Sequence, residues 1–438
     1  MNARAIIIGS PRSGSGKTTV ALGLMRAFRR RGVQVKAAKA GPDYIDPAFH
    51  AAACGGDSVN LDSWAMPPDL LAFLLRQAQE DADLLIIEAA MGLFDGAGEV
   101  DGRRGAAADL AALFGIPVAL VMDVSGQGQT AGAVACGFVH YDPRVRIAGV
   151  IANRVASGRH RLLVEQSLQR TGLPLLGALM RSGAPDLPER HLGLVQASEH
   201  QNLELLLDQL ADAIERQADL DGLLTAAKPV ESGPLSSNLS VALPPPAQRI
   251  ALAQDEAFSF VYPHILAEWR RAGAEILPFS PLADQAPDPS CDLCWLPGGY
   301  PELHAGRLAA SNIFLNGLRA FARKGAVHGE CGGFMLLGQG MEDKQGVRHA
   351  MAALMGHETS FARRKLNLGY REARLMAECP LGPVGGMMRG HEFHYATVTP
   401  GNDEPLVDLV DGQGNLIGPS GGRRNKVTGT FFHVIAQQ

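Results

Sequence analysis

Residues 5–19 read AIIIGSPRSGSGKTT, and this stretch predicts the fold of the first half of the chain. Its opening apolar run has the length of a buried strand, and the apolar positions from Val20 to Phe28 recur at helical spacing. A strand, a glycine-rich turn and a helix in this order are typical of a phosphate-binding loop, in which backbone N–H groups and a helix N-terminus hold an anion. We therefore expect a nucleotide site here.

Within the loop, Lys17 is expected at the terminal phosphates and the Thr18 hydroxyl on Mg²⁺. Pro11 stands where a glycine is usual, and Arg12 stands where one subgroup of these ATPases carries a second lysine. A glycine-rich turn that binds nothing is the alternative, and Gly-Lys-Thr-Thr at a strand–helix junction argues against it. The other nucleotide-binding candidates of the loop are Arg12, Gly14, Ser15, Gly16 and Thr19.

The composition is that of a globular protein of two or three domains, with 438 residues, of which 46% are hydrophobic and 19% charged. A net charge of −5 argues against a general role on nucleic acid or on a membrane surface. No apolar run is long enough to span a bilayer, and no signal peptide is recognisable. Six cysteines scattered through a long chain fit a reducing cytoplasm, which is the location we expect.

Acidic side chains follow the next apolar strands. A Pro/Gly loop at 39–47 carries Lys39, Asp43, Tyr44 and Asp46, the apolar run 84–87 ends in Glu88, and Asp95 follows in a loop. Strands that alternate with helical segments predict a doubly wound parallel sheet, whose strand ends form the usual ligand edge. Glu88 is expected to bind Mg²⁺, directly or through water.

Two of these features have equally good structural explanations. The 39–47 loop also reads as a solvated turn with helix-capping aspartates, and spacing alone does not separate the two readings. Asn153 ends another buried strand, where it can read a purine edge or make a strand-end hydrogen bond. Both alternatives stay open at the level of the residues.

A Pro/Ser-rich segment divides the chain. We expect a synthetase domain at 1–227, a linker at 228–247 and a second α/β domain at 248–438. Cys291 and Cys294 have redox or zinc spacing, but no second ligand pair follows, so we interpret them as part of a buried strand.

The second domain contains a nucleophile motif at Gly329-Glu330-Cys331-Gly332-Gly333. Small neighbours permit the sharp turn that exposes such a side chain, and the following helix favours the thiolate. A buried structural cysteine would leave the flanking glycines unexplained. Gly298 and Gly299 form a turn whose N–H groups can hold an oxyanion. Histidine candidates for the partner base are His391, His394 and His433, the last in a strand expected at 429–433.

Taken together, these motifs resemble those of cobyrinic acid and hydrogenobyrinic acid a,c-diamide synthases over essentially the full chain. The first half resembles dethiobiotin synthetase-like P-loop ATPases, and the second half resembles class I glutamine amidotransferases. The segments that carry the resemblance are SPRSGSGKTT, KAGPDYIDPAFH, IIEAAMGLFDG, PERHLGL, LPGGYPELH, GECGGFMLLG, RGHEFHYA and GTFFH.

The resemblance implies an ATP-dependent ligase. Mg-ATP would phosphorylate a carboxylate of a corrinoid polycarboxylic acid, and ammonia released from L-glutamine through a Cys331 thioester, with His433 as base, would replace the phosphate. Repetition on a second carboxylate would give the a,c-diamide. A homodimer is one assembly that fits, and neither nucleic acid nor membrane is expected as a partner. The family motifs imply substrate contacts at Lys39, Asp43, Tyr44, Asp46 and Asp95, and metal contacts at Thr18, Asp46 and Glu88.

One position departs from the class I pattern, and several alternatives remain. Many class I amidotransferases have a glutamate two residues after the catalytic histidine, whereas this chain has Ile435, so a dyad or another orienting group, such as Glu392, is expected. Related alternatives are a cobyric acid synthase and a nickel-sirohydrochlorin a,c-diamide synthase, against which the 43–46 and 188–191 segments argue. Arg12 also suits an ATP-driven switch or partition protein, but such a protein has no use for Cys331.

Overall fold

The chain forms two compact α/β units, Met1–Ser240 and Val241–Gln438. The computed structural model describes residues 3–181, 187, 189–190, 193–194, 196–200, 202–230, 242–363 and 365–438. The boundary between the units lies inside the segment expected as a linker. Lys228–Pro229 forms strand β10, which pairs antiparallel with Arg4 and Ala5 and so belongs to the first unit. Ala242 and Leu243 are buried in the second unit.

The first unit contains the doubly wound parallel sheet that the sequence predicts. Its main strands lie in the order β3-β2-β4-β1-β5-β6-β7 and pair in parallel. The carboxyl ends of β1, β2 and β4 therefore meet at one edge. The strands are β1 (Arg4–Gly9), β2 (Val35–Ala40), β3 (Ser58–Leu61), β4 (Leu84–Ala89), β5 (Val118–Asp123), β6 (Ile147–Val155) and β7 (Leu175–Met180).

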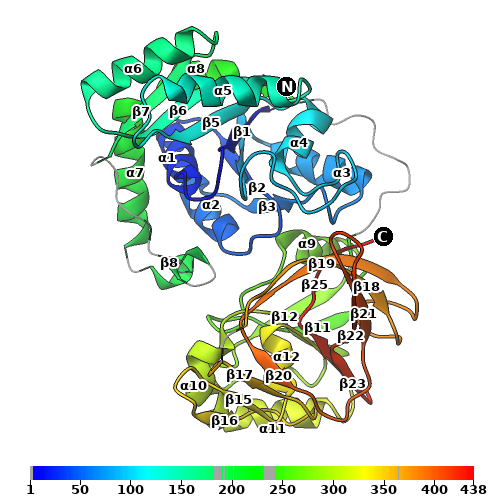
Figure 1. Ribbon diagram of the computed structural model, residues 1–438. Coiled ribbons are helices and arrows are strands. Elements are labelled where there is room, and N and C mark those ends of the chain that lie inside the picture. Colours follow the sequence, from blue (N-terminus) through cyan, green and yellow to red (C-terminus); the bar gives the residue numbers. More distant parts are fainter. Residues whose placement is uncertain are drawn as a thin grey trace. The chain divides into compact units, whose positions relative to one another are not determined.

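Helices cover both faces of this sheet (Figure 1). Helix α1 packs against α2 and α7, whereas α5 packs against α6. The helices are α1 (Lys17–Arg30), α2 (Asp46–Cys54), α3 (Pro68–Gln79), α4 (Ala107–Phe114), α5 (Thr130–Tyr141), α6 (Gly158–Gln169), α7 (Leu203–Gln217) and α8 (Leu220–Ala226), with a 3₁₀ turn at Ala197–Glu199. Of the 188–194 segment, Glu189–Arg190 (β8) pairs with Gly193–Leu194 (β9), while Pro188, His191 and Leu192 lie outside the described residues.

The second unit is built on a mostly parallel sheet of order β12-β11-β13-β14-β24-β23. Its strands are β11 (Arg249–Ala253), β12 (Glu275–Phe279), β13 (Leu293–Leu296), β14 (Ala326–Glu330), β23 (Gly422–Arg424) and β24 (Val427–Thr430). The helices are α9 (Pro263–Arg271), α10 (Ala305–Ala310), α11 (Asn312–Phe321) and α12 (Gly332–Leu337), with a 3₁₀ turn at Pro301–His304. Cys294 lies in β13, and both Cys291 and Cys294 are buried free thiols, as the strand interpretation predicts.

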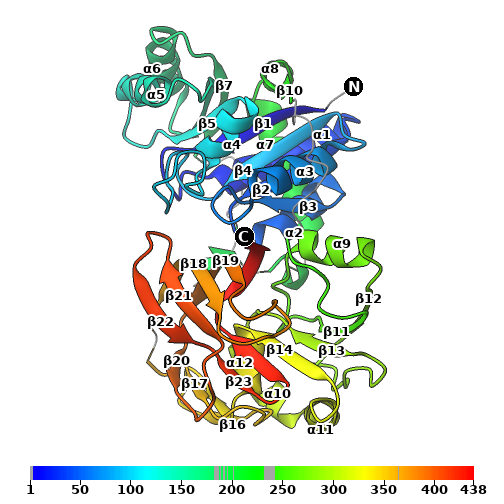
Figure 2. The ribbon, with the colours of Figure 1, turned by 90° about the vertical axis from the view of Figure 1, so that its right-hand side faces the viewer.

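Two smaller sheets complete the second unit. Figure 2 shows β18, β19, β21 and β22 side by side in the antiparallel sheet β22-β21-β18-β19-β25, and a mixed sheet has the order β16-β15-β17-β20. The strands are β15 (Gly340–Glu342), β16 (Arg348–Ala350), β17 (Glu358–Ser360), β18 (Asn367–Leu375), β19 (Met387–His394), β20 (Thr397–Thr399), β21 (Val407–Asp411), β22 (Leu416–Ser420) and β25 (His433–Gln437).

The prediction of one strand over residues 429–433 is wrong. The chain leaves β24 after Thr430, turns at Phe431 and Phe432, and enters β25 of a different sheet at His433. The Thr430 hydroxyl accepts the Phe432 N–H at 3.1 Å and so stabilises the turn. This turn places His433 at the start of a strand.

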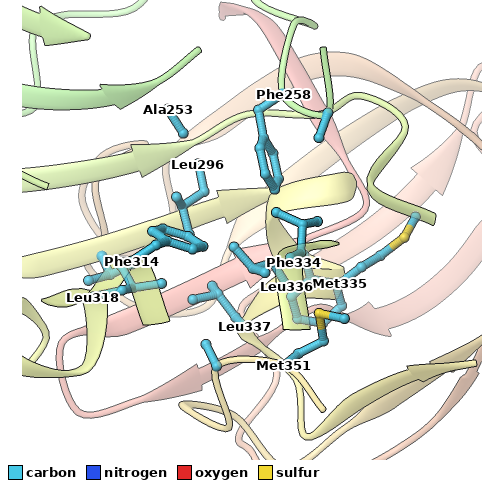
Figure 3. Packing of buried hydrophobic residues seen from close by; sticks show 14 of the residues in the cluster. Ala253, Phe258, Leu296, Phe314, Leu318, Phe334, Met335, Leu336, Leu337 and Met351 are labelled. Atoms are coloured by element: carbon cyan, nitrogen blue, oxygen red, sulfur yellow. The ribbon is translucent and has the colours of Figure 1, made fainter. Parts of the chain in front are cut away.

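The core of the second unit surrounds α12 (Figure 3). Phe334, Met335, Leu336 and Leu337 are all buried, and they belong to one hydrophobic cluster with Leu296 of β13 and other residues. A helix buried on every side cannot shift without opening cavities in its surroundings. The residue that precedes α12, Cys331, is therefore held in place by packing.

Candidate active sites

The loop between β1 and α1 has the backbone of a phosphate-binding loop. Gly14 and Gly16 have φ values of 74° and 89°, in the left-handed region that favours glycine. The Ser10 and Ser15 hydroxyls both donate to the Arg12 carbonyl oxygen, at 2.8 and 2.9 Å, and fix the loop from within. Helix α1 begins at Lys17, so its first N–H groups lie at the end of the loop.

The first turn of α1 carries the side chains that the motif predicts at the phosphates. Lys17 is buried, and burial lowers its pKa, against the opposing effect of the Glu88 carboxylate. Thr18 Oγ1 donates to Glu88 Oε1 at 2.6 Å, which joins the loop to the end of β4. Thr19 is half-buried in the same turn.

Lys39 lies between two carboxylates at this edge of the sheet. Its Nζ is 2.5 Å from Asp46 Oδ2 and 3.1 Å from Glu88 Oε1. Burial opposes the charge on Lys39, but the coulombic effects of Asp46 and Glu88 outweigh it and raise its pKa. Burial also opposes the charge on Glu88, but Lys39 and His50 outweigh it and lower the pKa of Glu88. The Lys39 ammonium and the Glu88 carboxylate are therefore both charged, and they lie at the ligand edge of the sheet.

His50 is a member of this cluster that the sequence analysis did not propose. Its Nε2 is 2.7 Å from Glu88 Oε2, and its Nδ1 is 3.3 Å from Ser58 Oγ. The only indication in the sequence was its position as the last residue of the KAGPDYIDPAFH segment. Helix α2 brings it to β4, since it follows the first residue of that helix, Asp46, by one turn.

The remaining substrate candidates lie in the two loops around this cluster. Asp43 Oδ1 accepts the N–H groups of Ile45 and Asp46 at 2.7 and 2.8 Å, which is the capping contact that the sequence left open. Tyr44 is half-buried beside it. Asp95 is exposed, and its carboxylate accepts the Gly92 N–H at 3.0 Å.

Hydrogen bonds from neighbouring residues fix both loops. Asn60, which the sequence analysis did not propose, donates from Nδ2 to the carbonyl oxygens of Gly41 and Asp43, at 2.9 and 2.8 Å. The N–H of Leu93 donates to the Ser10 carbonyl oxygen at 2.8 Å and connects the second loop to the phosphate loop.

Arg12 and Asn153 make contacts within the protein. One Asp123 oxygen at the end of β5 lies 3.1 Å from Arg12 and 2.6 Å from Arg154. Asn153 Nδ2 donates to the Ser15 carbonyl oxygen at 2.9 Å, and its Oδ1 accepts the Arg154 N–H at 2.9 Å. Asn153 thus makes a strand-end hydrogen bond that supports the loop, and the loop residue Arg12 forms an ion pair with Asp123.

In the second unit, Cys331 occupies a strained turn between β14 and α12. Its φ and ψ are 45° and −101°, and non-glycine residues rarely adopt such a positive φ. A Cβ on Gly333 would overlap the Leu296 carbonyl oxygen, so only glycine lets α12 pack this closely. The Cys331 N–H donates to the Thr430 carbonyl oxygen at 2.8 Å. This is the nucleophile elbow that the sequence predicts.

His433 and the Gly298-Gly299 turn lie beside this elbow. A Cβ on Gly298 would overlap the His433 imidazole, and a Cβ on Gly332 would lie 3.2 Å from the Gly299 nitrogen. The base, the elbow and the glycine turn are therefore neighbours, although the sequence separates Gly298 from His433 by more than a hundred residues.

Burial favours the neutral forms of the Cys331 thiol and the His433 imidazole. It raises the pKa of the Cys331 thiol, and it lowers the pKa of His433, with His391 and His394 adding to the effect. A neutral imidazole is the form that accepts a proton from a thiol.

The other histidine candidates surround His433. The rings of His391 and His433 stack with centroids 5.0 Å apart, and His391 Nε2 is 2.8 Å from the Tyr262 hydroxyl. His394 stacks on Phe431 with centroids 3.8 Å apart. Glu392, the orienting group considered above, accepts a hydrogen bond from Arg371 Nε at 2.7 Å.

Metal and membrane features are limited in the part of the chain that the structure describes. No group of three or more His, Cys, Asp and Glu residues there can hold a metal ion by itself. The oxygen donors Thr18, Asp46 and Glu88 nevertheless fit Mg²⁺, which commonly takes one or two carboxylates together with substrate phosphates. Among the described helices, none combines the length and the apolar character that crossing a bilayer requires.

Known protein families match both halves of the chain. Residues 6–195 match the family model of the CobQ/CobB/MinD/ParA nucleotide binding domain, and residues 249–438 match that of the CobB/CobQ-like glutamine amidotransferase domain. Proteins named hydrogenobyrinate a,c-diamide synthase are similar over nearly the whole chain. The one from Mesorhizobium japonicum is 61% identical over 100% of this chain and 99% of its own. Those from Agrobacterium fabrum and Rhodobacter capsulatus are 59% and 54% identical, with at least 99% of each chain covered.

Proposed function

Because the chain belongs to the family of hydrogenobyrinate a,c-diamide synthases, we propose that it converts the a and c carboxylates of hydrogenobyrinic acid to carboxamides, using ATP and L-glutamine. The observation that carries this proposal is the end-to-end similarity to proteins of that name, at 61% identity. It covers the phosphate loop and the cysteine elbow in one chain, which are the two sites that such a reaction needs. The cytoplasm, where ATP and L-glutamine are available, is part of the proposal.

The first half-reaction activates a carboxylate. A carboxylate oxygen of the substrate attacks the γ-phosphorus of ATP, the bond to ADP breaks, and an acyl phosphate forms. Lys17 and the loop N–H groups hold the phosphates, while the Lys39 ammonium neutralises an anion at the reacting centre. Mg²⁺, which Thr18, Asp46 and Glu88 would hold, supplies charge that offsets the phosphate oxygens. His50 and Lys39 keep Glu88 ionised for this role.

The second half-reaction releases ammonia. Cys331 Sγ attacks the amide carbon of L-glutamine as the thiol proton passes to His433. His433 then protonates the amide nitrogen, the C–N bond breaks, ammonia leaves, and a thioester remains on Cys331. The N–H groups of the Gly298-Gly299 turn stabilise the oxyanion, and water hydrolyses the thioester. Ammonia then attacks the acyl phosphate, and phosphate leaves. Repetition on the second carboxylate completes the product.

The alternatives are less well supported. A cobyric acid synthase or a nickel-sirohydrochlorin diamide synthase would act on other carboxylates or on another macrocycle, and the relatives reported above carry neither name. A switch or partition ATPase would need no cysteine elbow, yet Cys331 has both the strained turn and a neighbouring histidine.

Mass spectrometry of reaction products tests the proposal. Purified protein is given Mg-ATP and L-glutamine with hydrogenobyrinic acid, and in parallel with cobyrinic acid. We expect two successive acid-to-amide conversions followed by a stop, with hydrogenobyrinic acid as the faster substrate. Conversion of an already diamidated corrinoid instead would indicate a cobyric acid synthase. Intact glutaminase activity without conversion of either acid would refute the proposed substrate.

A further inference from the structure

The strand that carries His433 has an edge covered by side chains and loop backbone. Among the described residues β25 stands last in the sheet order β22-β21-β18-β19-β25, so its outer N–H and C=O groups need partners elsewhere. Glu330 Oε1 accepts the Val434 N–H at 3.1 Å, and His264 Nε2 donates to the Ile435 carbonyl oxygen at 3.0 Å. The Ala242 carbonyl oxygen accepts the Gln437 N–H at 2.7 Å.

The residue two positions after His433, where an orienting acid is expected, is the extra residue of a β-bulge. Arg389 of β19 pairs with Ala436, while the next residue, Gly390, pairs with Val434, so Ile435 is the extra residue. Ile435 is fully buried and stands two residues after His433, where many class I amidotransferases have a glutamate. Its side chain offers no hydrogen bond to the base. This position therefore does not orient His433 in the way that a glutamate would.

Two polar neighbours of His433 are poor substitutes for that acid. Glu392 Oε2 accepts a hydrogen bond from Arg371 Nε at 2.7 Å, and Glu392 belongs to β19, which carries neither Cys331 nor His433. His391 stacks its ring on that of His433, and a stacked ring limits rotation but does not set the distance to Cys331. What fixes that distance must contact both chain segments.

Glu330 makes such a contact. It immediately precedes Cys331 at the end of β14, and Val434 immediately follows His433 at the start of β25. One hydrogen bond therefore joins the chain of the nucleophile to the chain of the base. Glu330 is only 4% exposed, so water competes little for this contact. Burial raises the pKa of Glu330 to about 8, so at neutral pH the carboxyl adds little negative charge beside the thiol.

Resting on the glutaminase function proposed above, we propose that Glu330 is the positioning residue of the Cys331–His433 pair. By accepting the Val434 N–H, it holds the first residues of β25 against the elbow and sets the approach of His433 to the Cys331 thiol. It does not touch glutamine or the reacting atoms. It supplies a buried hydrogen-bond acceptor at the end of a side chain of fixed length, and a negative charge on that acceptor is not required.

Two substitutions and a control separate this role from a general structural one. Glu330→Gln keeps a carbonyl oxygen in the same place, and Glu330→Met keeps the length without the acceptor. The control is His328→Leu, because His328 is also buried on β14 but bonds Thr428 of β24, at 2.9 Å. For each variant, kcat and KM for glutamine hydrolysis, the rate of Cys331 alkylation by iodoacetamide and the thermal midpoint are measured. Ammonium-supported amidation reports on the first unit.

We expect the Met variant to lose on the order of 10- to 100-fold in kcat, as misplaced catalytic groups do, with KM changed less than about threefold. Its Cys331 should alkylate more slowly at neutral pH, and ammonium-supported amidation should be unchanged. The Gln variant should keep at least about half of the wild-type kcat. The His328 control should lower the thermal midpoint without the loss in kcat.

Three outcomes would overturn the inference. An undiminished kcat in the Met variant would show that the hydrogen bond is dispensable. A Gln variant as slow as the Met variant would show that the carboxyl group itself, and not an acceptor, is needed. An equal loss of kcat in the His328 control would indicate a structural effect. Wild-type protein that hydrolyses no glutamine would instead refute the proposed function along with the inference.

Discussion

In the second unit, single residues determine how close His433 comes to the Cys331 turn, and Gly298 is the clearest case. The His433 imidazole occupies the space that a side chain at position 298 would need. We expect Gly298→Ala to displace the base and lower the rate of glutamine hydrolysis by about 100-fold, while ammonium-supported amidation persists. Steady-state kinetics with each nitrogen donor check this. Gly306→Ala, whose Cβ would meet only ordinary contacts, is the control, and equal rates in both variants would contradict the geometry.

Glu330 also predicts a pH dependence of stability. Its pKa is raised from 4.5 to about 8 in the folded protein. Between these values the folded state binds a proton that the unfolded chain has released, so the free energy of unfolding falls as pH rises, by about 1.4 kcal/mol per pH unit. Glu330→Gln lacks this slope.

Denaturant unfolding of the second unit at about pH 5.5 and about pH 7.5 measures the effect. Relative to the Gln variant, wild-type protein should lose on the order of 2–3 kcal/mol between these two values. Curves that stay parallel over this range would show that the carboxyl is ionised in both states.

Among single residues, the sequence predicts those that stand within a recognisable local motif. Lys17, Thr18 and Cys331 are recognisable because a glycine pattern surrounds each of them. His50 and Glu330 were missed because their partners, Glu88 and Val434, are distant in sequence. A pairing across two strands depends on sheet order, and one sequence without a template does not give that order.

Among the elements, buried strands were the most predictable. The run 84–87 that ends in Glu88 is observed as expected within β4, because an apolar run bounded by turn residues leaves little choice. Helices α7 and α8 are separate elements, since Asp219 Oδ1 accepts the Gly222 N–H at 2.8 Å and starts α8. The second strand of the first unit begins at Val35, because Gly32 and Val33 close the end of α1 by backbone hydrogen bonds.

The contact between α1 and α7 stabilises the helix that begins with Lys17. Ion pairs join Arg26 to Asp208 and Glu204, at 2.7 and 2.8 Å. Beneath them, a Cβ on Gly23 would lie 2.6 Å from Ile214 Cγ1 and 3.0 Å from the Leu210 carbonyl oxygen. Close backbone approach, more than charge, is therefore expected to hold this pair of helices.

We accordingly expect Gly23→Ala to destabilise the first unit by about 1–3 kcal/mol through overpacking, and Arg26→Ala by about 1 kcal/mol or less. Thermal unfolding of both variants measures this, and ATP-dependent activity should fall with the former. A larger cost for the Arg26 variant would mean that the partly exposed ion pairs dominate the contact.

At the scale of the whole molecule, the sequence predicted two α/β units, but both ends of the linker predicted at 228–247 belong to folded units. A Pro/Ser-rich composition indicates a linker, yet Lys228–Pro229 pairs with β1 and Ala242 binds the side chain of Glu268. Backbone pairing at β10 needs no special side chain, so composition does not reveal it. Each unit nonetheless contains its own set of proposed catalytic groups, which predicts that their reactions are separable.

Lys17→Ala tests the separation from the side of the first unit. Loss of the buried ammonium should abolish amidation with either nitrogen donor, because the acyl phosphate no longer forms, while glutamine hydrolysis persists at some level. Product formation and glutamate release are measured in the same reaction. Lys228→Ala, an exposed lysine of the same unit, is the control. Undiminished ATP-dependent amidation would contradict the phosphate-loop assignment.

Cys331→Ala tests the separation from the side of the second unit. Without the thiol no thioester forms, so glutamine-supported amidation should fall to background. Ammonium added to the solution bypasses that step, and because the phosphate loop and the Lys39 cluster are built entirely from residues of the first unit, amidation should proceed with it at the wild-type rate. Cys379→Ala, which removes a partly buried thiol of the second unit, should keep both activities. Loss of the ammonium-supported reaction in the Cys331 variant would mean that this residue does more than supply ammonia, and that the two reactions are not separable in the way the two units predict.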